Sequence, residues 1–334
     1  GGTQKAKVAV SMGYLDQNGI MSNTGYKRYT IRFNTDLQLT KSFSAQVDAH
    51  IMQSKILEPS RGTADAIHWA GRIPANQTGV LSNGQWGEGW NGDNPIAFTQ
   101  DGGVRKEEAP SVTLNIILKY KPAKWLSMDV AYSPNYWQSS SSSFSKIVQT
   151  YRWDGSASYM SPQKSSLSAT NDRNLTNNLR STITFDKVYG NHNVKALAGY
   201  QQEDYRNDGI TGYREVFPFP DYPVLNSGGE LNQKSYGWAS EWALESFFGR
   251  LNYSYRDRYL LEGDFRYDGS SRFVGSRKWG MFPSFSAGWR ISEEPFFAML
   301  KDKISNLKLR ASWGKLGNQK IGSYPFSSDV NLGL

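Results

Sequence analysis

Apolar and polar residues alternate one by one along much of the chain. The odd positions from 29 to 39 carry Tyr29, Ile31, Phe33, Leu37 and Leu39, and charged or amide side chains lie between them. The same alternation returns at 43–51, 112–120, 126–132, 247–255, 259–267, 285–291 and 307–313. A period of two residues is typical of strands with one apolar and one polar face. The pattern therefore predicts an all-β chain.

About eleven strands are expected, and many of them are long. They cover 7–14, 27–39, 43–54, 111–119, 126–136, 178–187, 193–204, 244–255, 258–268, 282–291 and 305–315. Strands of soluble proteins commonly have about 5–6 residues, whereas a tilted strand that crosses a bilayer needs about 9–11. Only residues 294–302 favour a short helical turn.

The connections between these strands alternate in length. Long ones are expected at 15–26, 55–110, 137–177, 205–243, 269–281 and from 316 onward, and shorter ones at 40–42, 121–125, 188–192, 256–257 and 292–304. Outer-membrane barrels have short periplasmic turns and long extracellular loops. The chain is therefore predicted to be a segment of an antiparallel up-and-down transmembrane β-barrel, with the long loops outside the cell. The serine run 139–143 is expected at a flexible loop tip.

Aromatic residues make up 14% of the chain, and many fall near the expected strand ends. One set is Tyr14, Tyr136, Trp137, Tyr205, Tyr267 and Phe282, and the other is Tyr120, Trp125, Tyr189, Tyr255, Tyr259 and Trp289. Two such rows resemble the aromatic girdles of membrane barrels. The alternative is that aromatic residues simply favour strands.

Composition narrows the classes further. Mean hydropathy is −0.60, and no apolar run approaches the ~18 residues of a membrane-spanning helix. The chain has no cysteine, which excludes disulfides, thiol catalysis and cysteine metal sites. The net charge of +8 comes from dispersed residues, so no nucleic-acid partner is expected.

No residues form a recognisable catalytic, metal or cofactor site. Residues 87–92 match G-x-G-x-x-G, but they follow no expected strand and open no helix, so the dinucleotide interpretation fails. His50, His68 and His192 are scattered and lack the spacing of metal ligands. We therefore expect no enzyme activity and no cofactor.

Two groups of residues are candidates for contact with cargo or water. Charges in the middle of strands need solvent or partners, and a water-filled or plugged lumen provides both. The expected lumen-facing residues are Arg32, Arg250, Glu262, Asp264, Arg266, Arg290 and Arg310. In the 55–110 loop, aromatic rings beside polar groups suit sugar binding, and the candidates are Trp69, Trp86, Trp90, Asp93 and Asn94. The alternative is a loop that packs on itself.

One stretch carries a resemblance to a known family. Residues 258–273 read RYLLEGDFRYDGSSRF, residues 279–294 read WGMFPSFSAGWRISEE, and 304–314 and 317–322 read ISNLKLRASWG and GNQKIG. This closely resembles the barrel of SusC-like, TonB-dependent transporters of Bacteroidetes outer membranes. Residues 14–20 with 26–29, and 243–253, are similar to earlier hairpins of the same barrel.

The resemblance implies a barrel of about 22 strands plugged by an N-terminal domain. It also implies import of oligosaccharides or peptides, with glycans favoured. A SusD-like surface lipoprotein would act as a lid, and the TonB complex would supply energy through an N-terminal region. Residues 1–334 are then the middle part of the barrel, with the plug and the C-terminal strands outside the chain. In that case the sheet is open and curved, and strand 7–14 pairs with 27–39 but not with 305–315.

A soluble all-β carbohydrate-binding or glycoside-hydrolase domain is the alternative. It would also show alternation and exposed tryptophan. In a soluble domain the apolar face forms a core, whereas in a transporter it faces lipid.

Overall fold

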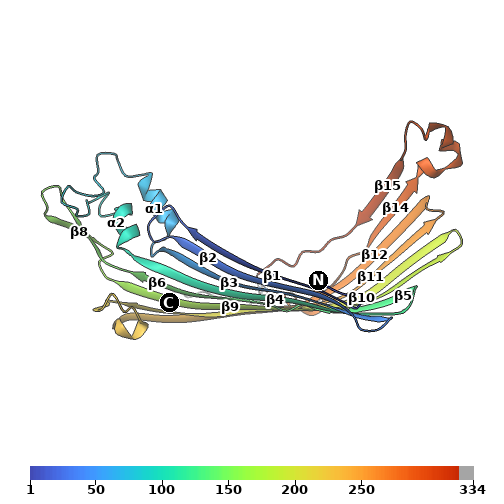
Figure 1. Cartoon of the computed structure of the whole chain (residues 1–334), viewed down its shortest axis with the longest axis horizontal. Helices are drawn as coiled ribbons and strands as arrows, with labels where there is room; N and C mark the ends of the chain where they lie inside the picture. The colour runs from blue at the N-terminus through green and yellow to red at the C-terminus, as the bar shows by residue number, and fades with distance from the viewer. Residues whose placement is uncertain (323–334) are drawn as a thin grey trace.

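The computed structural model describes residues 1–322, and most of them form one large antiparallel sheet (Figure 1). Its strands are β1 (Ala6–Asn18), β2 (Gly25–Gln38), β3 (Phe43–Pro59), β4 (Gly103–Ala123), β5 (Leu126–Tyr132), β6 (Asn135–Ser145), β9 (Ser166–Tyr189), β10 (His192–Glu215), β11 (Gly229–Tyr255), β12 (Tyr259–Ser270), β13 (Trp279–Met281), β14 (Ser284–Arg290) and β15 (Lys308–Gly314). A separate pair consists of β7 (Val148–Tyr151) and β8 (Ala157–Ser161).

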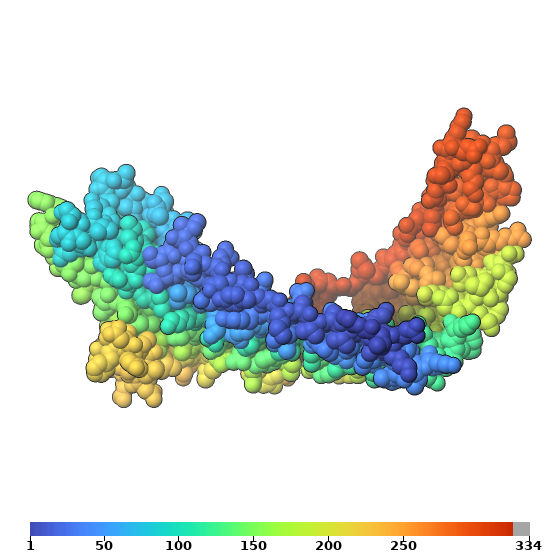
Figure 2. Space-filling model, viewed as in Figure 1, coloured from blue at the N-terminus to red at the C-terminus, as the bar shows by residue number. Residues whose placement is uncertain are grey.

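The sheet is open, as the sequence predicted. Strands pair in the order β1-β2-β3-β4-β5-β9-β10-β11-β12-β14-β15, while β6 pairs with β4 and β9, and β13 pairs with β12. Within residues 1–322, β1 pairs only with β2 and β15 only with β14. Figures 1 and 2 show that the sheet bends into a trough, with β14 and β15 rising at one end.

The strands extend far beyond the alternating segments. β9 and β10 have 24 residues each and β11 has 27, so most of 205–243 and much of 137–177 are strand rather than loop. The expectation of a flexible serine tip at 139–143 is wrong, because these residues lie in β6 between β4 and β9. The hydrophobic alternation stops in these extensions, while the backbone pairing continues.

The expected strand 126–136 is divided into β5 and β6 at Ser133 and Pro134. Proline has no N–H group to donate to a ladder, so it interrupts the pairing there. The Pro134 carbonyl still accepts a hydrogen bond from the Leu114 N–H at 3.0 Å.

Short helices occupy the connections. The expected turn at 294–302 is confirmed as the 3-10 helix η4 (Pro295–Leu300), preceded by η3 (Ile291–Glu293). The sequence did not predict α1 (Thr63–Ala70) and α2 (Pro95–Gln100), which lie between β3 and β4. Two further 3-10 turns are η1 (Leu225–Ser227) and η2 (Gly275–Arg277). None of the helices in residues 1–322 is long and apolar enough to span a membrane.

The two longest connections between strands of the large sheet, 60–102 and 146–165, lie at the same end of the sheet, but the link 291–307 at the other end is also long. In Figure 1, α1, α2 and β8 lie at the left end, whereas the short hairpin after β9 and the link with η3 and η4 lie at the right end. The Asn23 amide, in the β1–β2 loop, donates to the Thr99 carbonyl at 2.9 Å and so joins the same cluster of loops. The expected alternation of loop lengths therefore holds only in part, because the β1–β2 connection shrinks to residues 19–24 and the β14–β15 link covers residues 291–307.

One face of the sheet is a continuous apolar band. Across the strands Ile31 lies opposite Ile51 and Ile51 opposite Val112, and further on Phe265 lies opposite Gly249. Large side chains on this face stay exposed, among them Met12, Ile31, Ile51, Leu118, Met128, Val130, Ile183, Leu251, Leu261, Phe265, Phe285 and Trp313. An exposed apolar surface of this extent is typical of contact with lipid or another protein, not of a soluble core.

Aromatic rows border this band over β10 to β14. At one border the ring centroids of Tyr200 and Phe247 are 5.2 Å apart, and those of Tyr267 and Trp279 are 4.8 Å apart. At the other border Tyr255 stacks on Tyr259 at 6.4 Å. Tyr259 and Tyr267 are eight residues apart, or about 27 Å along the strand.

Three members of the expected girdles are on the wrong face. Trp137 lies opposite Ser111 and Asn174 on the polar face, and Phe282 exchanges backbone hydrogen bonds with Arg266 on that face. Tyr205 lies opposite Trp242 on the polar face of the sheet, because the pairing of β10 with β11 has no register shift between His192 and Tyr213. Its ring therefore points away from the apolar band.

Candidate functional site

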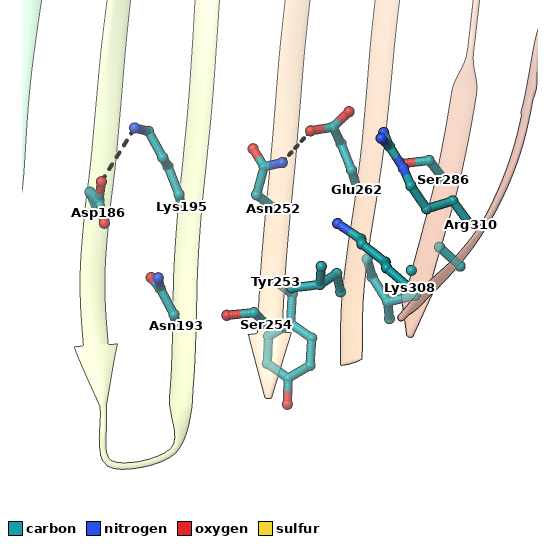
Figure 3. A pocket seen from close by; sticks show the side chains of 14 residues that line it. Asp186, Asn193, Lys195, Asn252, Tyr253, Ser254, Glu262, Ser286, Lys308 and Arg310 are labelled. Atoms are coloured by element: carbon teal, nitrogen blue, oxygen red, sulfur yellow. Dashed lines mark hydrogen bonds and ion pairs between the residues drawn. The ribbon is translucent and has the colours of Figure 1, made fainter. Parts of the chain in front are cut away.

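The polar face of β9 to β15 carries a cross-strand network of charges and amides. The Lys195 ammonium lies 3.4 Å from the Asp186 carboxylate on the neighbouring strand. Further along, the Asn252 amide donates to Glu262. Figure 3 shows these side chains, with Ser286 and Arg310, around a hollow of about 440 Å³. The register of each strand thus places polar groups side by side on one wall.

A second cluster lies on the same wall, closer to the end that carries the long loops. The Arg250 guanidinium donates to Asp264 at 2.6 Å, and the Ser284 hydroxyl donates to the same carboxylate at 3.2 Å. Arg266 binds Asp268 at 2.7 Å and donates to the Ser246 hydroxyl at 2.9 Å. These pairs are partly exposed, and exposed ion pairs contribute only about 0–1 kcal/mol. Their geometric effect is to hold polar side chains of neighbouring strands against one another.

The seven expected lumen residues are not all equivalent. Arg250, Glu262, Asp264, Arg266 and Arg310 share the polar face of β11, β12 and β15. Arg32 has the matching position on β2, opposite His50, several strands away.

Arg290 does not lie in the middle of a strand. It is the last residue of β14, donates to the Asp257 carbonyl at 3.3 Å and lies 3.8 Å from Glu293. This arginine therefore stabilises the end of the sheet that carries the β9–β10 and β11–β12 turns, which we call the short-turn end. Its expected position in the middle of a strand is wrong.

The 60–102 segment folds around Arg61. Its guanidinium binds Asp93 at 2.7 Å and Asp65 at 2.6 Å, and it lies 4.4 Å from the centre of the Phe98 ring. These contacts tie α1 and α2 to the loop between them. Asp93 is therefore engaged in holding the segment together, and its expected role in substrate binding stays a prediction.

Asn94 is engaged within the same segment. It is 1% exposed, and its side-chain oxygen caps α2 by accepting from the Ile96 and Ala97 N–H groups at 3.1 Å. Its amide donates to the Gly79 carbonyl at 2.6 Å and the Gly87 carbonyl at 2.8 Å. All of its hydrogen-bonding capacity serves the fold, as is usual for an N-cap.

The three tryptophans of this segment differ in what they offer. Trp86 donates its indole N–H to Asp101 at 2.8 Å and is partly buried. Trp69 lies edge-on to His68, with the ring centroids 5.5 Å apart, and is also partly buried. Trp90 is 47% exposed. The segment therefore packs largely on itself, and Trp90 has a free ring surface.

Residues of the polar wall that the sequence reasoning missed lie at 205–243. Tyr205, Trp238 and Trp242 are on paired strands, whereas a loop was expected there. A signal was present, because Tyr236, Trp238 and Trp242 all occupy even positions. Small residues between them, such as Ala239, hid the alternation.

At the short-turn end, Glu294 is buried and holds three side chains. It accepts from the Trp289 indole N–H at 3.0 Å and from Arg258 at 3.2 Å. Hydrogen bonding to Tyr259, followed by the bond from Trp289, holds the pKa of Glu294 below its usual value. The carboxylate therefore stays ionised at the junction of β12, β14 and η4.

Within residues 1–322, no three His, Asp or Glu side chains come close enough together to hold a metal ion. The features that the fold does build are a polar wall, an apolar band and a cluster of loops at one end.

Comparison with known proteins gives a consistent result. The model of a family described as "TonB dependent receptor-like, beta-barrel" matches residues 57–325. The TonB-dependent receptor P3 of Formosa agariphila is 27% identical over 97% of this chain and 32% of its own length. The TonB-dependent receptor SusC of Bacteroides thetaiotaomicron is 28% identical over 96% of this chain and 33% of its own length. The chain thus spans about a third of these relatives.

Solved structures show the same fold. The RagAB peptide importer in its closed-closed state superimposes with a TM-score of 0.74 and 18% identity, over 97% of this chain and 36% of that chain. The ferric citrate transporter FecA gives a TM-score of 0.51 at 7% identity, over 92% of this chain and 43% of that chain.

Proposed function

Since the chain belongs to the TonB-dependent receptor-like β-barrel family, we propose that it forms the middle part of the barrel of an active nutrient importer. Its relatives from Bacteroides and Formosa place the chain in the outer membrane of a Gram-negative bacterium. The whole protein takes up oligomers, and glycans are favoured over peptides. The plug and the remaining strands belong to parts of the protein outside residues 1–334.

The pairing of an apolar band with a polar wall carries this proposal. A β-barrel spans the membrane with its apolar face toward lipid and a polar interior. Leu261 and Phe265 lie on the band, whereas Glu262 and Asp264 lie on the wall, so each strand separates lipid from a wet passage. A soluble carbohydrate-binding or hydrolase domain does not account for so much exposed apolar surface.

Two partners follow from the proposal. A SusD-like surface lipoprotein covers the end that carries α1, α2 and the other long connections. The TonB complex supplies energy through a region outside this chain. The preference for glycans rests on aromatic rings beside amide and hydroxyl groups, which suit sugars. RagAB is described as a peptide importer, so peptide cargo is the second candidate.

Uptake in living cells tests the proposal. Cells that lack the gene, and cells complemented with the full-length gene, would be given fluorescent oligosaccharides or peptides of matched length. Accumulation of an oligosaccharide should require the gene and an energised inner membrane, and an uncoupler should abolish it. Gene-dependent uptake of peptides alone would refute the glycan preference. Uptake that persists with the uncoupler would refute active import.

A further inference from the structure

β11 carries large aromatic side chains on its polar face, near the end with the long loops. Trp238 and Trp242 occupy even positions, as does Arg250, and the register places all three on the same wall. Within β10, Tyr205 and Gly209 lie opposite Trp242 and Trp238, respectively. This part of the wall lies well beyond the aromatic row at Phe247, so it faces the outer vestibule of the channel.

Trp238 lies flat on the wall because its partner is a glycine. A Cβ atom on Gly209 would be only 2.2 Å from Cζ2 and 2.6 Å from Cε2 of Trp238. Any larger residue at 209 would have to displace the ring. One face of the indole therefore rests on the β10 backbone. Trp238 remains 38% exposed, so the opposite face of its ring is open.

Hydrogen bonds fix the orientation of this ring. The Trp238 indole N–H donates to the Asn207 side-chain oxygen at 3.2 Å. The Asn207 amide in turn donates to Asp172 at 2.8 Å and to the Arg173 carbonyl at 3.2 Å. A rigid ring loses little entropy when a ligand binds to it.

Trp242 is different, because both sides of its ring are engaged. Tyr205 of β10 stacks on it with centroids 5.5 Å apart and an angle of 16° between the planes. Arg272, which follows β12 on the other side of β11, lies 5.4 Å from the ring centre. Trp242 thus supports its neighbours, and Trp238 is the ring available to a ligand.

We propose that Trp238 is a stacking platform for a pyranose ring of the cargo, an inference that rests on the proposed import of glycans. A pyranose presents a flat C–H face that packs on an aromatic ring, and its hydroxyls need polar partners at the edge. Asn174, opposite Asn207, donates to the Tyr205 hydroxyl at 2.9 Å. In the described part of the chain, the Tyr205 proton and the Asn174 side-chain oxygen have no partner, so both can serve sugar hydroxyls.

Binding to the purified full-length transporter tests this platform. Calorimetry in detergent would use neutral hexasaccharides of α-1,4-glucose, β-1,4-glucose, β-1,3-glucose and β-1,4-xylose, with a Gly-Ser hexapeptide for comparison. For a sugar that binds, Trp238→Ala should weaken affinity about tenfold or more, whereas Trp238→Phe keeps a flat ring and should lose far less. Trp153→Ala is the matched control, because Trp153 is 90% exposed outside this wall.

A second variant moves the ring without removing it. Gly209→Ala keeps the Trp238 side chain but displaces its ring, so it should weaken sugar binding as Trp238→Ala does. Its Cβ would also lie 2.8 Å from the Asn171 carbonyl oxygen, so heat-dependent gel migration must first show that the variant barrel is folded. Unchanged affinity in both variants, with sugar still binding, would overturn the platform and leave the proposed function intact. Binding of the peptide alone would contradict both, as would binding of no probe.

Discussion

Leu261 and Glu262 are neighbours in β12, yet their side chains meet different surroundings. Leu261 is 54% exposed on the apolar band, whereas Glu262 accepts a hydrogen bond from Asn252 on the polar wall. The alternation of side chains along a strand makes this separation possible. A slip of one residue in register would reverse it for the whole strand.

Substitution at these two positions measures the register directly. Leu261→Arg should lower the free energy of unfolding by roughly 2–4 kcal/mol if the residue lies near the bilayer midplane. Glu262→Gln should cost far less, because an amide still bonds in a hydrated lumen. Denaturant unfolding of the full-length barrel in lipid vesicles gives both values. A larger cost for Glu262→Gln would mean that the two faces have been exchanged.

Glu294 provides a test that depends on pH. Its pKa is lowered in the folded protein by hydrogen bonds from Tyr259 and Trp289. A carboxyl group whose folded pKa lies below the unfolded value stabilises the fold above the unfolded pKa and loses this effect as pH falls through the folded pKa. The difference in melting temperature between the wild type and Glu294→Gln should therefore be largest near neutral pH. It should shrink below about pH 4.5, the ordinary value for glutamate.

Thermal melts at several pH values would show this difference. Glu293→Gln is a suitable control, because the partly exposed Glu293 carboxylate binds Lys301 on the surface. A difference for Glu294→Gln that does not depend on pH would show that the ionised form of this carboxylate is not what stabilises the turn.

At the scale of elements, β6 is the clearest departure from the sequence prediction. The five consecutive serines 139–143 pair with β9 on one side, and 140–143 also pair with β4 on the other. Serine has no strong preference for strands, so its neighbours on both sides determine the conformation. Local sequence carries no information about such pairing.

Proline substitution tests whether the serine run is a strand. Ser141 lies opposite Glu107 and Thr170, so Ser141→Pro should remove a backbone hydrogen bond in the middle of the sheet and cost about 1–3 kcal/mol. Ser82→Pro is the control, because Ser82 follows Leu81 in a turn where proline fits. Heat-dependent migration of the folded barrel in gels would report both. Equal, small effects would mean that 139–143 is a loop.

The contrast between strands with one apolar face and strands with two polar faces explains which parts of the fold the sequence predicted. Strands inside the apolar band, such as β2 and β12, were predicted within a few residues because lipid and water impose opposite demands on their two faces. The upper halves of β9, β10 and β11 were missed because both faces are wet there. The cap at Asn94 and the ion pair of Asp93 were also missed. Polar residues beside tryptophans have the same sequence pattern whether they bind a ligand or hold a loop together.

For the whole molecule, the shared end of the long connections is predicted to lie outside the cell. A cysteine at Ala157, in the long-loop region, should react with a membrane-impermeant maleimide on intact cells that express the full-length protein. A cysteine at Asn191, in the short β9–β10 turn, should react only after the outer membrane is opened. Both residues are exposed in this chain, and cells that lack the lipoprotein would be used so that the proposed lid cannot cover Ala157. Equal labelling would refute this orientation.

The length of β11 has a consequence for how cargo is found. Its 27 residues extend for about 90 Å, whereas about 9–11 residues are enough to cross the bilayer. The long strands β9, β10 and β11 therefore continue far past the apolar band, whereas β12 has 12 residues and β14 has 7. The sheet thus has an uneven outer edge, raised over three neighbouring strands. Under the proposed import, cargo that arrives from outside would first meet this raised edge, a hydrogen-bonded sheet and not a loop.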